Sequence, residues 1–126
     1  MAWLPLIAMP ARGADVSWRT DRSLLVATIE GALDAAVAPA LRESLRRLLH
    51  KGGGRLIIDL SAVTHADING LTVLVGTGRQ ASLLGGLLRL AAPAAELSGL
   101  LRTTGLDRQL RVFPSVEAAI SGVGSP

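Results

Sequence analysis

Residues 55–60 read RLIIDL and decide the fold, because they are apolar on successive positions and not on alternating ones. Such a run is typical of a strand that is covered on both faces, so we expect this strand at the centre of a sheet. A few residues later HADING, residues 65–70, leads into apolar positions at helical spacing. A helix is therefore expected from about residue 71 to 84, where two glycines end it.

The sequence on both sides of this stretch alternates between strand-like and helix-like segments. Strands are expected at residues 23–31, 87–92 and 109–113, with a weaker one at 15–18 that could form a hairpin through residues 19–22. Helices are expected from residue 37 to the glycines at 52–54, at 93–105 and at 115–121. Strand and helix alternate four times with short connections, which predicts an α/β fold with a mainly parallel sheet. The expected core comprises Ile57, Ile58, Leu60, Leu71, Leu74 and Val75.

The length of 126 residues fits one domain with a sizeable core. We expect this domain to span residues 15–121, after a disordered or loosely packed N-terminal extension at 1–14 and before a tail at 122–126. The first residues, MAWLPLIAMP, lack the basic start of a secretory signal and contain two prolines, so they are not interpreted as one. No apolar run reaches the length of a membrane span.

The charge pattern gives little support for nucleic-acid binding. The pI is near 11, but 13 Lys and Arg face 10 Asp and Glu, which leaves a net charge of only +3. The pI is high because Tyr and Cys are absent and Lys51 is the only lysine, so little titrates between neutral pH and strong alkali. The absence of cysteine excludes disulfides and fits a cytoplasmic location. The first expected helix carries a basic stripe that consists of Arg42, Arg46 and Arg47. We interpret it as a solvated helix face in preference to a binding site for an acidic partner.

No arrangement typical of catalysis or cofactor binding is found in the sequence. Lys51 precedes the glycines at 52–54, whereas a phosphate-binding loop needs its lysine after them. GTGRQA at 76–81 lacks the third glycine of a dinucleotide fingerprint and falls inside a helix. His50 and His65 have no partner at metal-ligand spacing, and no serine lies in a G-x-S-x-G turn. We therefore expect a non-enzymatic protein without a cofactor or a metal.

Two polar turns remain as the candidate site. GALDAA at 31–36 and HADING at 65–70 each follow a strand-like segment. The carboxyl ends of parallel strands meet at one edge of a sheet, so Asp34, Asp67 and Asn69 share a surface if those strands are neighbours. The alternative is structural, since Asp and Asn commonly start helices and Gly eases a tight turn.

Three blocks carry a resemblance to a known family: GALD at 31, LIIDLSAVTHADINGL from 56 and RTTGLDRQLRVFPSVEAAI from 102. In this order and at these separations, they resemble the STAS domain of bacterial anti-sigma factor antagonists over residues 15–121. The resemblance implies a small mixed sheet of four to five strands, with about four helices packed mainly on one side. It also implies a partner, namely an anti-sigma factor with a histidine-kinase-like Ser/Thr kinase domain. Neither direct nucleic-acid nor membrane contact is expected, and the protein should be a monomer or a weak dimer.

The resemblance also assigns roles to the HADING turn. In the family's D-S-S-G or D-S-T-G turn, the residue before the glycine is phosphorylated, which prevents binding. Asp67 matches the aspartate, Ile68 the first serine, Asn69 the phosphoacceptor and Gly70 the glycine, so the acceptor hydroxyl is missing here. Asp34 matches the acid of the family's G-E-L-D stretch, while Ala32 replaces the glutamate.

The resemblance thus implies an antagonist-like regulatory module that is not phosphorylated at residue 69. The alternative is a scaffold or transporter-associated STAS protein, with a stress complex or an ABC or anion transporter as its partner. The partner-binding residues implied are Asp34, Asp67, Ile68, Asn69, Gly70, Leu71, Thr72 and Val75.

Overall fold

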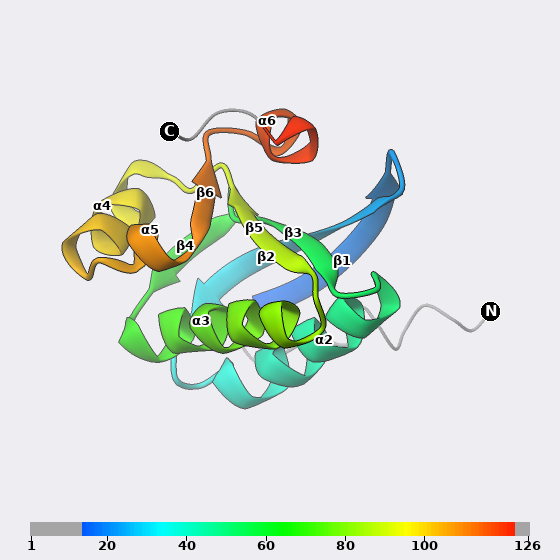
Figure 1. Ribbon diagram of the computed structural model, residues 1–126. Helices are drawn as coiled ribbons and strands as arrows, with labels where there is room; N and C mark the ends of the chain where they lie inside the picture. Colours follow the sequence, from blue (N-terminus) through cyan, green and yellow to red (C-terminus); the bar gives the residue numbers. More distant parts are fainter. Residues whose placement is uncertain (1–13, 123–126) are drawn as a thin grey trace.

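The computed structural model describes residues 14–122, so the expected extension at 1–14 and tail at 122–126 lie almost entirely outside the described residues (Figure 1). The strands are β1 (Ala14–Asp21), β2 (Leu24–Leu33), β3 (Arg55–Asp59), β4 (Val63–Ala66), β5 (Leu87–Ala91) and β6 (Arg111–Phe113). The helices are α2 (Ala38–Lys51), α3 (Ile68–Leu83), α4 (Ala95–Thr103), α5 (Leu106–Gln109) and α6 (Val116–Ser121).

The strands form one mixed sheet in the order β1-β2-β3-β5-β6. β1 runs antiparallel to β2, and all the other pairings are parallel. β2 pairs with β3 along its first half and with β4 along its second half, across an irregularity between Gly31 and Ala32. The α/β class and the mostly parallel sheet are confirmed. Residues 14–122 hold six strands and five helices, slightly more than the sequence predicted, because β4 and α5 were missed.

β3 is central, as RLIIDL predicts, because it lies between β2 and β5 with apolar cover on both faces. Leu56 and Ile58 point into the main core, which α2 and α3 cover. Ile57 points to the opposite face and packs in a smaller cluster with Phe113 and residues of α6. Figure 1 shows α2 and α3 side by side below the sheet and α6 above it, so the helices cover both faces unequally. Of the expected core residues only Val75 is not fully buried, although it packs against the main cluster.

The first two strands form the expected hairpin, but its turn is shorter than predicted. Residues 19–21 belong to β1, and only Arg22 and Ser23 form the turn, both with positive φ, at 51° and 70°. Two-residue turns of this kind match the twist of antiparallel strands, but they usually contain Asn or Gly. The turn was therefore predicted too long because its residue types do not indicate it.

α3 begins three residues earlier than predicted, at Ile68. The strand directly before it is β4 and not the RLIIDL strand, because the short segment VTHA pairs with β2. α2 ends as predicted at the glycines, of which Gly53 and Gly54 take left-handed φ values of 68° and 89°. The last helix begins after Ser115, whose hydroxyl oxygen accepts a hydrogen bond from the amide of Ala118 at 3.0 Å.

Candidate functional site

The two polar turns lie side by side at the carboxyl ends of β2 and β4. These strands are parallel neighbours, with Leu33 opposite Ala66. The amide of Asp67 donates a hydrogen bond to the carbonyl of Leu33 at 3.0 Å, which ties one turn to the other. The strands before the two turns are thus neighbours, which is the condition under which Asp34, Asp67 and Asn69 were expected to share a surface.

Asp67 starts helix α3. Its Oδ1 atom accepts hydrogen bonds from the amides of Asn69, at 2.9 Å, and Gly70, at 3.1 Å. Amides in the first turn of a helix have no partner within the helix, so this carboxylate satisfies two of them and lies at the positive end of the helix dipole. Asp67 thus fixes the backbone on which Ile68 and Asn69 are displayed.

Asp34 performs a similar role before α2. Its Oδ1 atom accepts hydrogen bonds from the amides of Ala36, at 3.1 Å, and Val37, at 3.3 Å, and its side chain is half-buried. Both acidic residues therefore hold turns in place, as the structural alternative predicts. In each case Oδ2 makes no hydrogen bond to the described residues.

Gly70 brings α3 against the end of β2. It is buried, and a Cβ atom added there would collide with the backbone of Leu33 and would press against the amide of Asp34. Any side chain at residue 70 would push the start of α3 away from the loop at residue 34. The glycine is thus needed for close approach of the backbones and not for an unusual φ.

The accessible part of the site is smaller than the predicted list of partner-binding residues. Ile68 is 57% exposed, and Asn69 and Thr72 are also exposed. Leu71 is fully buried, so its side chain packs in the core and is not free for a partner. We define the α3-start surface by its at least partly accessible members: Asp34, Asp67, Ile68, Asn69, Thr72 and Val75.

A groove beside this surface was not predicted from the sequence. It has a volume of about 390 Å³ and lies between β4 and α4. β4 contributes Thr64 and His65 to its wall, and α4 contributes Leu97 and Leu100. The groove was missed because its strand wall, β4, was not recognised in the sequence.

The basic stripe on α2 is partly neutralised. Arg46 donates a hydrogen bond to Glu43 at 2.7 Å, and Arg47 lies 3.4 Å from the same carboxylate. The hydrogen bond from Arg46, together with the charges of both arginines, lowers the pKa of Glu43 below its ordinary value. These contacts agree with the interpretation of this helix face as solvated.

Replacing Asp67 by alanine is expected to destabilise the protein by about 1 kcal/mol, the usual cost of losing a helix N-cap. Both first-turn amides lose their acceptor in this variant. Asp67→Asn keeps an acceptor oxygen at the same position and should stay close to the wild type. Urea unfolding of the three proteins measures this, and equal stability of Asp67→Ala and wild type would contradict the capping role.

The fold and this surface together define a class of protein: a small α/β domain that presents a helix start beside a neighbouring turn. In residues 14–122, no helix is long and apolar enough to cross a membrane. A family model described as the STAS domain matches residues 15–119.

The chain is 35% identical to the anti-sigma-B factor antagonist of Bacillus subtilis (strain 168) over 106 residues, which cover 84% of this chain and 96% of the relative. It is 29% identical to the anti-sigma-F factor antagonist RsfB of Mycobacterium tuberculosis, over 78% of this chain and 80% of the relative. The crystal structure of an anti-sigma factor antagonist from Mycobacterium paratuberculosis has the same fold, with a TM-score of 0.78 at 24% identity, over 87% of this chain and 93% of that one. The chain therefore belongs to the STAS domain proteins of the anti-sigma factor antagonist family, which are not enzymes.

Proposed function

We propose that this protein is an anti-sigma factor antagonist that binds its anti-sigma factor through the α3-start surface and remains permanently competent to bind. The observation that carries the proposal is the exposed start of α3, where Ile68 and Asn69 lie on a backbone held by Asp67. The relatives named above are antagonists of anti-sigma-B and anti-sigma-F factors. By their example the partner is an anti-sigma factor, and release of its sigma factor is the output.

The competence to bind follows from the chemistry of residue 69. In the family that the sequence resembles, a Ser or Thr at this position receives a phosphate from the anti-sigma factor, which is also a histidine-kinase-like Ser/Thr kinase. An Asn side chain has no hydroxyl oxygen to attack a phosphoryl group, so Asn69 cannot carry that modification. Phosphorylation would bring a charge of about −1.5 to −2, which this surface never gains at residue 69.

We expect the protein to act in the cytoplasm, as a monomer or weak dimer, and without direct contact to nucleic acid or membrane. An apolar contact at Ile68 suits such a protein interface, because interfaces are anchored by a few side chains at their desolvated centre. Asp34 and Asp67 would surround this anchor with charge.

The direct test compares two exposed apolar residues at opposite ends of the same helix. Ile68 and Leu83 are 57% and 82% exposed, so neither supports the core. Ile68→Ala is expected to weaken binding to the purified anti-sigma factor about tenfold, as for a side chain that contributes somewhat over 1 kcal/mol to an interface.

Leu83→Ala, the matched control, should bind like the wild type. Isothermal titration of the anti-sigma factor with the three proteins measures both effects. If Ile68→Ala binds as tightly as Leu83→Ala, the α3-start surface is not the interface. Capture of a transporter subunit or a stress complex in place of an anti-sigma factor would favour the scaffold alternative.

A further inference from the structure

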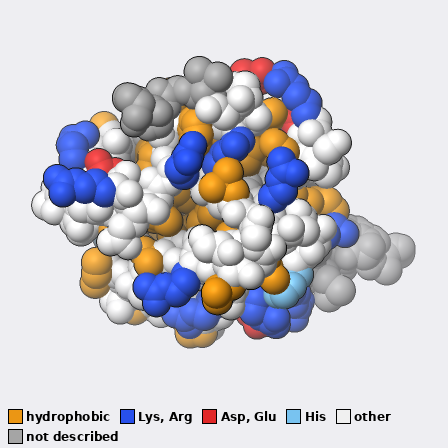
Figure 2. Space-filling model, in the orientation of Figure 1, with side chains coloured by type: hydrophobic (Ala, Val, Ile, Leu, Met, Phe, Trp, Pro, Cys, Tyr) orange, Lys and Arg blue, Asp and Glu red, His pale blue; other side chains and the backbone are white. Residues whose placement is uncertain are grey.

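Three arginines from three neighbouring strands share the sheet face that is opposite α2 and α3. Arg89 of β5 is paired in register with Arg111 of β6 on one side and with Ile57 of β3 on the other. Arg55 lies two residues before Ile57 and so points to the same face. Figure 2 shows Lys and Arg side chains gathered among apolar ones on this side of the molecule. We call Arg55, Arg89 and Arg111 the arginine row.

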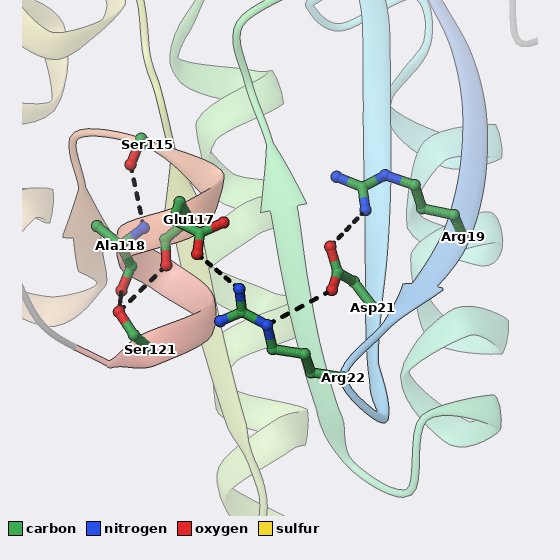
Figure 3. A network of polar contacts seen from close by, with 7 residues as sticks. All are labelled: Arg19, Asp21, Arg22, Ser115, Glu117, Ala118 and Ser121. Atoms are coloured by element: carbon green, nitrogen blue, oxygen red, sulfur yellow. Dashed lines mark hydrogen bonds and ion pairs between the residues drawn. The ribbon is translucent and has the colours of Figure 1, made fainter.

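Two arginines of the β1–β2 hairpin are paired with carboxylates. Arg22, in the β1–β2 turn, forms an ion pair with Glu117 of α6 at 2.7 Å, and Arg19 pairs with Asp21 at 3.0 Å (Figure 3). Within residues 14–122, no carboxylate lies within ion-pair distance of any member of the arginine row. The row is therefore a concentration of positive charge that the described residues leave uncompensated.

Arg89, in the middle of the row, is held in a partly buried position. Its Nη1 atom donates a hydrogen bond to the carbonyl of Ala119 at 2.6 Å, and its guanidinium carbon lies 5.7 Å from the centroid of the Phe113 ring. Its Nε atom is buried and has no hydrogen-bond partner among residues 14–122. Burial lowers the pKa of Arg89, and the charges of Arg111 and Arg55 lower it further. An anion beside the row would relieve this repulsion and give free N–H groups an acceptor.

The surface around the row is hollowed on two sides of Leu87. A hollow of about 20 Å³, enough for about one water-sized group, is lined by Arg55, Arg89 and Leu87 among others. A larger groove of about 380 Å³ runs between α3 and β6, and Arg111 and Arg79 border it together with Gln109. The small hollow admits at most one oxygen of an anionic group, while the larger groove has room for the remainder of a ligand.

We propose that the arginine row binds a phosphate group, carried either by a small soluble molecule or by a lipid headgroup. Arginine suits this chemistry because its planar guanidinium donates paired hydrogen bonds to phosphate oxygens. The site is distinct from the α3-start surface: Arg55 and Arg111 are the first residues of their strands, whereas Asp34 and Asp67 follow the carboxyl ends of β2 and β4. It therefore goes beyond the proposed function and does not depend on it.

A simpler role for these arginines is to cover Ile57 and Phe113 with their aliphatic stems, as long charged side chains often do on apolar surfaces. The two roles differ in what Arg111→Gln should change. A purely covering role involves no ligand. If the row is a phosphate site, loss of the Arg111 charge weakens anion binding. This holds even though the loss also removes one of the two charges that repel Arg89.

The experiment is isothermal titration of the full chain with pyrophosphate at low ionic strength. The wild type is expected to show saturable binding, and Arg111→Gln should bind at least about tenfold more weakly, the usual effect of losing a hydrogen bond to a charged group. Arg42→Gln removes the same charge from the exposed face of α2, on the other side of the sheet, and should bind like the wild type. Arg111 is exposed, so the melting temperature of Arg111→Gln without ligand should be no lower than that of the wild type.

A second arm distinguishes the two sources of phosphate. Vesicles of phosphatidylcholine, with and without phosphatidic acid, are sedimented with each protein. Binding to phosphatidic acid vesicles alone, lost in Arg111→Gln and kept in Arg42→Gln, assigns the phosphate to a lipid headgroup. Equal binding by the two variants with both probes, or no binding of the wild type to either probe, would overturn the proposal.

Discussion

Gly70→Ala is expected to destabilise the protein by roughly 3 kcal/mol, at the upper end of the usual range for overpacking a buried site. The added Cβ would collide with the carbonyl of Leu33 and press against the amide of Asp34. These are backbone atoms of a strand end, which cannot rotate away as a flexible side chain would. The helix must then move outward, which would also break the hydrogen bond from Asp67 to Leu33.

Gly76→Ala is the matched control, since both glycines lie in α3. Gly76 is exposed, and apart from the backbone of its own helix an added Cβ would meet no atom of residues 14–122 within 4 Å. Alanine is favoured over glycine inside a helix by about 0.8–1 kcal/mol, so this variant should be slightly more stable than the wild type. Urea unfolding of both variants measures the contrast. If Gly70→Ala gained stability as Gly76→Ala does, α3 would not be held against β2 as described.

The larger elements were predictable because their signals are local. The continuous apolar run of β3, the helical spacing in α2 and α3, and the glycines after α2 each determine structure within a few residues. β4 was missed because VTHA is short and half polar, and it is a strand only through its pairing with β2. The tight turn at Arg22 and Ser23 was missed because neither residue type is typical of positive φ.

The candidate site was predictable in outline and not in detail. Adjacency of the turns at Asp34 and Asp67 follows from the general geometry of parallel strands. Leu71 was predicted both as a core residue and as a partner-binding residue, and only the side of α3 that faces the sheet decides between the two. The role of Gly70 depends on how closely α3 approaches Leu33. Both are properties of tertiary packing that residue types alone do not specify.

The second large effect is expected for Asn69→Ser in the presence of ATP. If the partner is a kinase, this variant regains a hydroxyl at the exposed first turn of α3 and should become phosphorylated there. Two unit charges roughly 6 Å apart at an effective dielectric constant near 20 interact by about 3 kcal/mol. Asp67 is hydrogen-bonded to the amide of residue 69, so a phosphate at this position would lie close to its carboxylate.

Repulsion from Asp67 and Asp34 is present in the free protein too, so the loss of affinity would come from an acidic group of the partner. A repulsion of the size given above exceeds the stabilisation of an anion at a helix start, about 0.3–1 kcal/mol. Phosphorylated Asn69→Ser is therefore expected to bind the partner about a hundredfold more weakly, since each 1.4 kcal/mol corresponds to a factor of ten. Asn69→Asp adds only one charge at the same position. Its loss of affinity should be in the same direction but smaller.

We propose that Asn69 leaves the protein permanently competent to bind. This is measured by titration of the purified anti-sigma factor with wild type, Asn69→Ser and Asn69→Asp. Each protein is incubated with and without ATP, and phosphorylation sites are mapped by mass spectrometry. We expect the wild type to bind equally in both conditions, Asn69→Ser to lose affinity only with ATP, and Asn69→Asp to bind more weakly than the wild type in both. Phosphate on residue 69 of the wild type, or binding of Asn69→Asp as tight as that of the wild type, would contradict it.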